Sequence, residues 1–243
     1  MGLIGNQVYV NSVPGVRIPP LLLISLRYMI KKIAQKLNLP EDVAKVLLQV
    51  SNKLKSHNIP FQVIGGIAVG VHSSPRTTKD VDFIIKSEDI NKIKKLYVTN
   101  PLLMSNQDGL STNIDGVDVD FIIINDEESF LFEGNKSIPV ENHSFDPLSA
   151  ANLIYMKLQS QRTKDMSDVI EILKKDTNQI PLLKKEIFLK IKNSDLNNKK
   201  QILSDVEENF DSLANIALLE EKKSKNTRTA FYKAVLNNLN KTN

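Results

Sequence analysis

Two aspartates one residue apart, Asp80 and Asp82, begin an otherwise apolar run that continues to Ile85. Side chains two positions apart in a β-strand point to the same face, so a strand here places the two carboxylates side by side. Like charges in this arrangement repel each other, and an ordinary core strand does not carry them. A bound divalent cation removes the repulsion, and carboxylate oxygens suit Mg²⁺ or Mn²⁺, which also bind phosphates.

A pair of glycines, Gly65 and Gly66, precedes the acidic strand. The residues from Phe61 onward predict an apolar strand that breaks at the glycines into a short apolar helix. Glycine lets the backbone approach a ligand closely, and the free amides at the start of a helix attract phosphate. The glycine pair therefore predicts a phosphate-binding turn shortly before the carboxylates.

A second acidic strand is predicted within the stretch Gly116–Ile124, where Asp118 and Asp120 alternate with apolar residues. A solvated edge strand would show the same alternation, and this interpretation stays open for the segment taken alone. Together with the first strand, three carboxylates from two neighbouring strands would hold two metal ions about 4 Å apart, a spacing that serves phosphoryl or nucleotidyl transfer.

These motifs resemble, in order, those of the nucleotidyltransferase superfamily whose best-known member is DNA polymerase beta. The chain carries Gly65-Gly66, then Arg76-x-Thr78-x-Asp80-x-Asp82, and later Val119-Asp120-Phe121. Within the superfamily it is most similar to the stand-alone enzymes grouped with the AbiEii/AbiGii abortive-infection toxins. Those carry a further helical motif, which reads here as Lys157, Arg162, Asp165 and Asp168. The resemblance covers about residues 55–175.

The resemblance implies transfer of a nucleoside monophosphate from a nucleoside triphosphate to an acceptor hydroxyl, with Mg²⁺ or Mn²⁺ as the cofactor. It assigns the catalytic carboxylates, which are also the metal ligands, to Asp80, Asp82 and Asp120. The nucleotide-binding positions that it implies are Gly65, Gly66, Arg76, Thr78 and Lys157, and Lys157 is counted as catalytic as well.

Two positions depart from the pattern of the superfamily. Many members carry a serine at the second glycine, where its hydroxyl meets a phosphate, but Gly66 offers only its backbone amide. The second acidic strand offers Asp118 in addition to Asp120. The spacing of the superfamily favours Asp120 as the third metal ligand and leaves Asp118 as a neighbour on the same face.

The basic residues of the motifs have plainer interpretations beside the functional ones. Lys157 is expected on a helix about 100° away from the buried Leu158, where an ordinary surface lysine is the alternative to a triphosphate contact. Arg76 would suit a plain loop as well as a phosphate contact. The charged residues that follow Lys157 are expected to pair with one another at helical spacings, namely Arg162, Asp165 and Asp168.

The resemblance leaves the acceptor open. The first candidate for the acceptor is an RNA end, in particular that of tRNA, as in the toxin members of the family. The second candidate is a protein hydroxyl and the third is an antibiotic. A non-catalytic member of a toxin–antitoxin pair, which binds a nucleotide or a partner, is an alternative of a different class. The retained carboxylates argue against it, because a protein without activity has no use for a costly cluster of like charges. A toxin-type enzyme would have a cognate antitoxin protein as its partner.

The sequence predicts an α+β fold, with a small mixed β-sheet nucleotidyltransferase core, flanking helices and a C-terminal helical bundle. The expected regions are an N-terminal arm and helix (1–39), the catalytic core (40–145) and the helical domain (146–243). Helices are expected over 21–37 and from Pro40 onward. Asp146 and Pro147 are expected to start the first helix of the last region, as an N-cap followed by proline.

Composition narrows the class of protein. The absence of cysteine excludes a disulfide framework or a thiolate nucleophile and fits a reducing cytoplasm. The apolar stretch 18–30 is too short to span a bilayer, so no membrane partner is expected.

The positive charge of the chain is concentrated in its last part. Residues 174–243 carry a net charge of +5, against −1 for 1–173. A solvated helical surface and an RNA-binding surface both explain this excess, and aromatic residues are sparse there.

Overall fold

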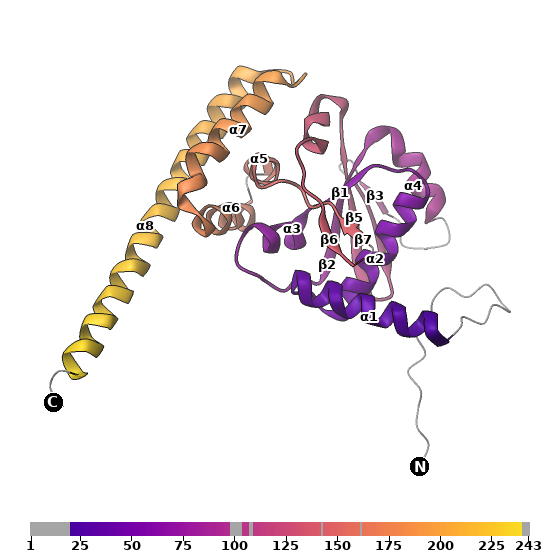
Figure 1. Ribbon diagram of the computed structural model, residues 1–243. Coiled ribbons are helices and arrows are strands. Elements are labelled where there is room, and N and C mark those ends of the chain that lie inside the picture. The colour runs from indigo at the N-terminus through magenta and orange to yellow at the C-terminus, as the bar shows by residue number, and fades with distance from the viewer. Residues whose placement is uncertain (1–19, 98–103, 107–108, 142, 161, 240–243) are drawn as a thin grey trace, which may run out of the picture.

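The computed structural model describes residues 20–97, 104–106, 109–141, 143–160 and 162–239 (Figure 1). The arm expected over 1–19 lies outside these ranges. The helices are α1 (Pro20–Leu37), α2 (Glu41–Ser56), α3 (Gly65–His72), α4 (Ile90–Leu96), α5 (Ala150–Ser160), α6 (Thr163–Lys175), α7 (Ile180–Asn193) and α8 (Lys199–Leu239). The strands are β1 (Phe61–Val63), β2 (Asp80–Lys86), β3 (Met104–Asn106), β4 (Gly109–Ile114), β5 (Val117–Ile124), β6 (Ile138–Val140) and β7 (His143–Phe145).

Five strands form one mixed sheet in the order β1-β2-β5-β4-β3. Only β2 and β5 run parallel to each other, whereas the other neighbouring pairs are antiparallel. A parallel pair needs a crossover between its strands. Here α4 and the β3–β4 hairpin lie between β2 and β5 in the sequence. The small mixed sheet with flanking helices confirms the predicted α+β class.

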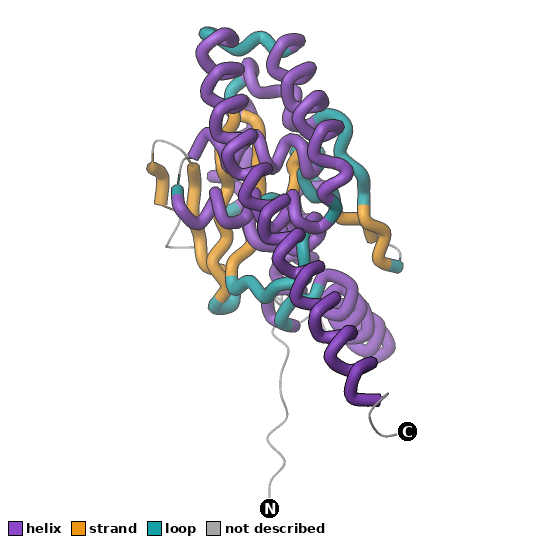
Figure 2. The backbone as a smooth tube through the Cα atoms, turned by 90° about the vertical axis from the view of Figure 1, so that its left-hand side faces the viewer, coloured by secondary structure: helices purple, strands orange, loops and turns teal. Residues whose placement is uncertain are grey.

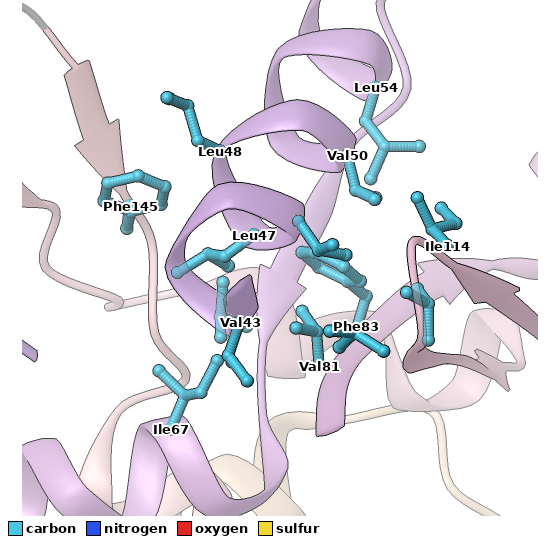
Figure 3. Packing of buried hydrophobic residues seen from close by; sticks show 14 of the residues in the cluster. Val43, Leu47, Leu48, Val50, Leu54, Ile67, Val81, Phe83, Ile114 and Phe145 are labelled. Carbon is cyan, nitrogen blue, oxygen red and sulfur yellow. The ribbon is translucent and has the colours of Figure 1, made fainter. Parts of the chain in front are cut away.

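The alternation of β2 divides its side chains between two hydrophobic cores. Val81, Phe83 and Ile85 are fully buried in the first core, together with residues of α1 and α2. Figure 3 shows Val81 and Phe83 beside the apolar side chains of α2. The ring of Phe83 stacks on Phe121 of β5 at a centroid distance of 5.7 Å. Burying one such side chain contributes roughly 1.5–3 kcal/mol, so this face anchors the two strands firmly.

The opposite face of the same strands belongs to the second core. Ile84 and Ile124 pack there with residues of α3, α5, α6, α7 and α8. Figure 1 accordingly shows α3, α5 and α6 on the other side of the sheet from α2 and α4. The residues that precede Ile84 on this face are Asp80 and Asp82, so the acidic ends of the strands look toward α3, α5 and α6.

The first C-terminal helix begins later than predicted. Residues 146–148 pair with β1 instead, because the amide of Val63 donates to the carbonyl of Asp146 and the amide of Leu148 donates to the carbonyl of Val63, each at 2.9 Å. This pairing needs extended backbone, so Asp146 and Pro147 cannot start a helix and the expected cap is wrong. Ser149 takes that place, since its hydroxyl accepts from the amide of Asn152 at 3.3 Å.

The last two helices run side by side along the C-terminal region, as Figures 1 and 2 both show. The apolar residues of α8 form a helical stripe that is buried at Val206, Phe210, Leu213 and Ala217 and half-buried at Ile202. The helical C-terminal region is thereby confirmed, while its boundary with the core stays a prediction. None of the described helices is long and apolar enough to cross a membrane.

Candidate active site

The register of β2 and β5 gathers four aspartates on one face of the sheet. Asp80 pairs with Asp118 and Asp82 pairs with Asp120 across the parallel strands. Asp80, Asp82 and Asp120 are half-buried, while Asp118 is exposed and accepts from the side-chain amide of Asn113 at 2.8 Å. The structure therefore brings together the three carboxylates that the sequence singled out, with Asp118 at the rim.

Gly65 lies directly against the carboxylate of Asp82. A β-carbon at Gly65 would sit 1.7 Å from Oδ2 of Asp82, and the backbone has a φ of +59° there. Both conditions require glycine, since other residues rarely adopt this φ and any side chain would collide with the carboxylate. The amide of Ile64 donates to the carbonyl of Asp82 at 2.9 Å, which fixes the turn to the acidic strand.

The second glycine accommodates the loop that leads into β2. A β-carbon at Gly66 would lie 2.5 Å from the hydroxyl oxygen of Thr78, so a serine here would force the loop to shift. The Thr78 hydroxyl in turn donates to Oδ1 of Asp80. This contact gives a physical reason for the departure from serine, because Thr78 occupies the space that a side chain at Gly66 would need.

The gathered aspartates make ionisation of Asp82 costly. Burial, together with the negative charges of Asp80 and Asp120, raises the pKa of Asp82 from its ordinary value of 3.8 to about 7. The positive charges of Lys164 and Lys157 oppose this shift in part. The acidic face is therefore short of positive charge, which is the electrostatic condition of a cation-binding site.

Lys157 is not a surface lysine. Its ammonium donates to Oδ1 of Asp165 at 2.6 Å and to Oδ2 of Asp168 at 2.7 Å, and only 9% of its side chain is exposed. Burial alone would hinder ionisation of Asp165, yet the hydrogen bonds from Lys157, Ser160 and Arg162 hold its pKa down at about 2. Lys157 thus joins α5 to α6 through a buried ion-pair cluster.

Arg76 extends this cluster to the loop before β2. Its guanidinium donates to both carboxylate oxygens of Asp168, through Nη1 to Oδ1 and through Nη2 to Oδ2 at 3.5 Å. The expected pairing within the helical motif holds for Arg162 with Asp165 at 2.6 Å. For Asp168 the expected pairing is wrong, because its partners come from other elements. The three-residue spacing of Asp165 and Asp168 places both on one helix face, and this spacing was the sequence feature that could have indicated a shared cationic partner.

The donor set of the acidic face suits a hard divalent cation, but its side chains are not arranged around one. Carboxylate oxygens and a surplus of negative charge are what Mg²⁺ or Mn²⁺ would require. Within the described ranges, however, no group of three or more His, Cys, Asp or Glu side chains is placed so that it could hold a metal ion. One oxygen of Asp80 is engaged by Thr78. The metal assignment therefore stays a prediction.

Comparison with known proteins finds similarity among solved structures. No family model and no curated protein matches the chain. An antigenic nucleotidyltransferase-like protein from Paracoccidioides brasiliensis is 20% identical, over 56% of this chain and 74% of that one, with a TM-score of 0.38. A putative nucleotidyltransferase from Thermotoga maritima is 15% identical, over 64% and 94%, with a TM-score of 0.37. ANT(2")-Ia in complex with adenylyl-2"-tobramycin is 11% identical, over 58% and 94%, with a TM-score of 0.45.

Replacing Asp82 should stabilise the protein in a pH-dependent way. Because the pKa of Asp82 is about 7 in the folded state and 3.8 ordinarily, the folded state retains this proton as pH rises between those values. Stability is therefore lost through that window and stays low above it. In EDTA, Asp82→Asn should raise the free energy of unfolding at pH 8 by about 1–3 kcal/mol, below the full shift because water and salt screen the charges. At pH 4 the gain should vanish.

The control for this experiment is Glu208→Gln, which removes an exposed carboxylate from α8. Urea denaturation at both pH values gives the free energies. If Asp82→Asn changed the free energy of unfolding equally at pH 4 and pH 8, the ionised carboxylate of Asp82 would not destabilise the folded state.

Replacing Lys157 should destabilise the protein strongly. Lys157→Met removes the ammonium that the buried Asp165 and Asp168 share and leaves each with one arginine, Arg162 and Arg76 respectively. The loss should therefore be about 3 kcal/mol, the low end of the cost of breaking a buried ion pair. Lys136→Met, at an exposed lysine, should change the free energy of unfolding by less than about 0.5 kcal/mol. Urea denaturation at pH 7.5 measures both variants. A Lys157→Met protein as stable as the parent would contradict the structural role of the cluster.

Proposed function

We propose that this chain is a metal-dependent nucleotidyltransferase, which transfers a nucleoside monophosphate from a nucleoside triphosphate to an acceptor hydroxyl. The observation that carries the proposal is the register that joins Asp80 and Asp82 to Asp120 on one sheet face beside the Gly65 turn. A fold gains nothing in stability from such a cluster, because each added carboxylate makes ionisation of the others more costly. Binding of a divalent cation together with the phosphates of a nucleotide would give the carboxylate cluster a function.

The acidic residues would hold the metal. Asp80, Asp82 and Asp120 would bind Mg²⁺ or Mn²⁺, which when bound supplies positive charge to the triphosphate and to the attacking oxygen. Binding would draw the carboxylate of Asp82 into its ionised form, since a nearby positive charge lowers the pKa of an acid. Asp118 lies at the rim and pairs with Asn113, so it would adjust the local charge without being required.

The remaining residues would position the nucleotide and manage the proton. The amides of Gly65 and Gly66 open α3 and would donate to phosphate oxygens. Arg76 is held by Asp168 but one third of its side chain remains exposed, so it could turn further N–H groups toward a phosphate. The acceptor hydroxyl would give its proton to Asp120, its oxygen would bond to the α-phosphorus, and pyrophosphate would leave with the electron pair of the broken bond.

For the acceptor we propose an RNA end, with tRNA first, in a toxin-type enzyme of the cytoplasm that has a cognate antitoxin. The support outside the resemblance is the net positive charge of the C-terminal region, where some of the lysines are paired with carboxylates. Lys184 pairs with Glu207 at 3.0 Å and with Asp211 at 2.8 Å, so its charge is largely balanced. A protein hydroxyl and an antibiotic are therefore included as acceptors in the experiment.

Nucleotidyl transfer should depend on the half-buried aspartates and not on the exposed one. Each labelled nucleoside triphosphate is incubated with Mg²⁺ and total RNA, a protein extract or an aminoglycoside, and incorporation is measured. Asp82→Asn and Asp120→Asn should each lower incorporation at least about 100-fold, because charge on the phosphates is no longer balanced. Asp118→Asn should lower it less than about tenfold. Parent-like incorporation by a folded Asp82→Asn protein would refute the proposal.

A further inference from the structure

The lysine that the helical motif offers for a phosphate contact already has two partners. The ammonium of Lys157 lies between Asp165 and Asp168, at 2.6 and 2.7 Å, in a site that is almost closed to solvent. Releasing it toward a triphosphate would break two buried ion pairs and leave Asp165 and Asp168 with only Arg162 and Arg76 as counter-charges, which is unfavourable. The charge of Lys157 is therefore committed to holding α5 against α6, and the phosphates need another cation.

Lys164 is exposed in the first turn of α6, directly before Asp165. Within the part of the chain that the structure describes, its ammonium forms no ion pair with a carboxylate. Its charge is therefore available to a ligand.

The fold places Lys164 on the acidic side of the sheet. Helix α6 packs through Val169 in the second core, which also contains Ile84 of β2. Asp80 and Asp82 share the face of Ile84, so α6 and the carboxylates lie on the same side.

The N-terminal half of α6 is tied to the loop that enters β2. Asp168 is held by Arg76 of that loop, and Lys164 stands one helical turn before Asp168 on the same side of α6. The ion pair thus keeps the N-terminal end of α6, and Lys164 with it, close to the start of the acidic strand.

We propose that Lys164, rather than Lys157, is the lysine that contacts the triphosphate of the nucleotide, an assignment that rests on the proposed nucleotidyl transfer. Its ammonium would bind the phosphate oxygens on the α6 side of the acidic face, while Arg76 would approach from the loop. Lys157 is then a positioning residue, which fixes the corner between α5 and α6 from which Lys164 extends.

The test measures binding to the full-length protein with Mg²⁺ present. Isothermal titration with each of the four nucleoside triphosphates, and with inorganic tripolyphosphate, is made on the parent, Lys164→Met, Lys164→Arg and Lys136→Met. Lys164→Met should weaken the binding of triphosphates and tripolyphosphate about 10- to 100-fold, the range of a lost charge-assisted contact. Lys164→Arg should recover most of the affinity, and Lys136→Met should match the parent. Nucleoside monophosphates should show a smaller loss, since fewer phosphates reach the lysine.

A second measurement separates a contact with phosphate from an effect on folding. The urea midpoint of Lys164→Met in EDTA at pH 8 should fall slightly, and in the Asp82→Asn background the same substitution should have no effect. Unchanged triphosphate affinity in Lys164→Met, with the parent binding normally, would overturn this inference alone. A parent that binds none of the probes would overturn both the proposed function and the phosphate contact, although the midpoints would still report whether Lys164 lies beside Asp82.

Discussion

Parallel pairing of β2 with β5 sets Asp80 beside Asp118 and Asp82 beside Asp120, and the surrounding structure has to accommodate the repulsion that results. Apolar contacts on the other face of the same strands offset it, because Val81, Val119 and the stacked Phe83 and Phe121 are fully buried there. Those side chains fix the register, since a slip of one residue would turn the aspartates into the first core. The apolar packing on one face of the strands therefore sets the positions of the aspartates on the other face.

Charged groups around the acidic face fall into two sets with different roles. One set is closed: Lys157 and Arg76 are paired with Asp165 and Asp168, and this cluster joins the consecutive helices α5 and α6 to the loop before β2, which is distant from them in the sequence. The other set is open, because within the described ranges Asp80, Asp82, Asp118 and Asp120 form no ion pair at such short distances. A buried ion pair adds little stability over apolar packing, but it requires one specific arrangement of its partners. The closed cluster can therefore hold the helices in place while the open face remains available to a ligand.

Local sequence patterns predicted the elements of the site but not how they meet. The alternation in β2 and β5 and the glycines before them depend on neighbouring residues, so the α+β core, Gly65 and the aspartates were predictable. The helical pattern also showed that Lys157 lies off the apolar stripe. The second partner of Asp168 was not predictable, because its contact with Arg76 is made by residues far apart in the chain. Asp146 and Pro147 were misassigned for the same reason, since pairing with β1 overrode a good local helix start.

The length of α8 has a consequence for the dynamics of the molecule. The helix has 41 residues, and Ala217 is its last buried side chain among those described. Glu220 and Glu221 still contact Lys174 and Thr177, each at 2.7 Å, and Figure 1 shows the helix beyond them extending away from the rest of the protein. A helix segment without tertiary packing opens at little cost in free energy, whereas a packed segment opens only with its core. Amide hydrogen exchange along α8 is therefore expected to be graded, from slow beside α7 to fast toward Leu239, so that one continuous helix spans two regimes of local stability.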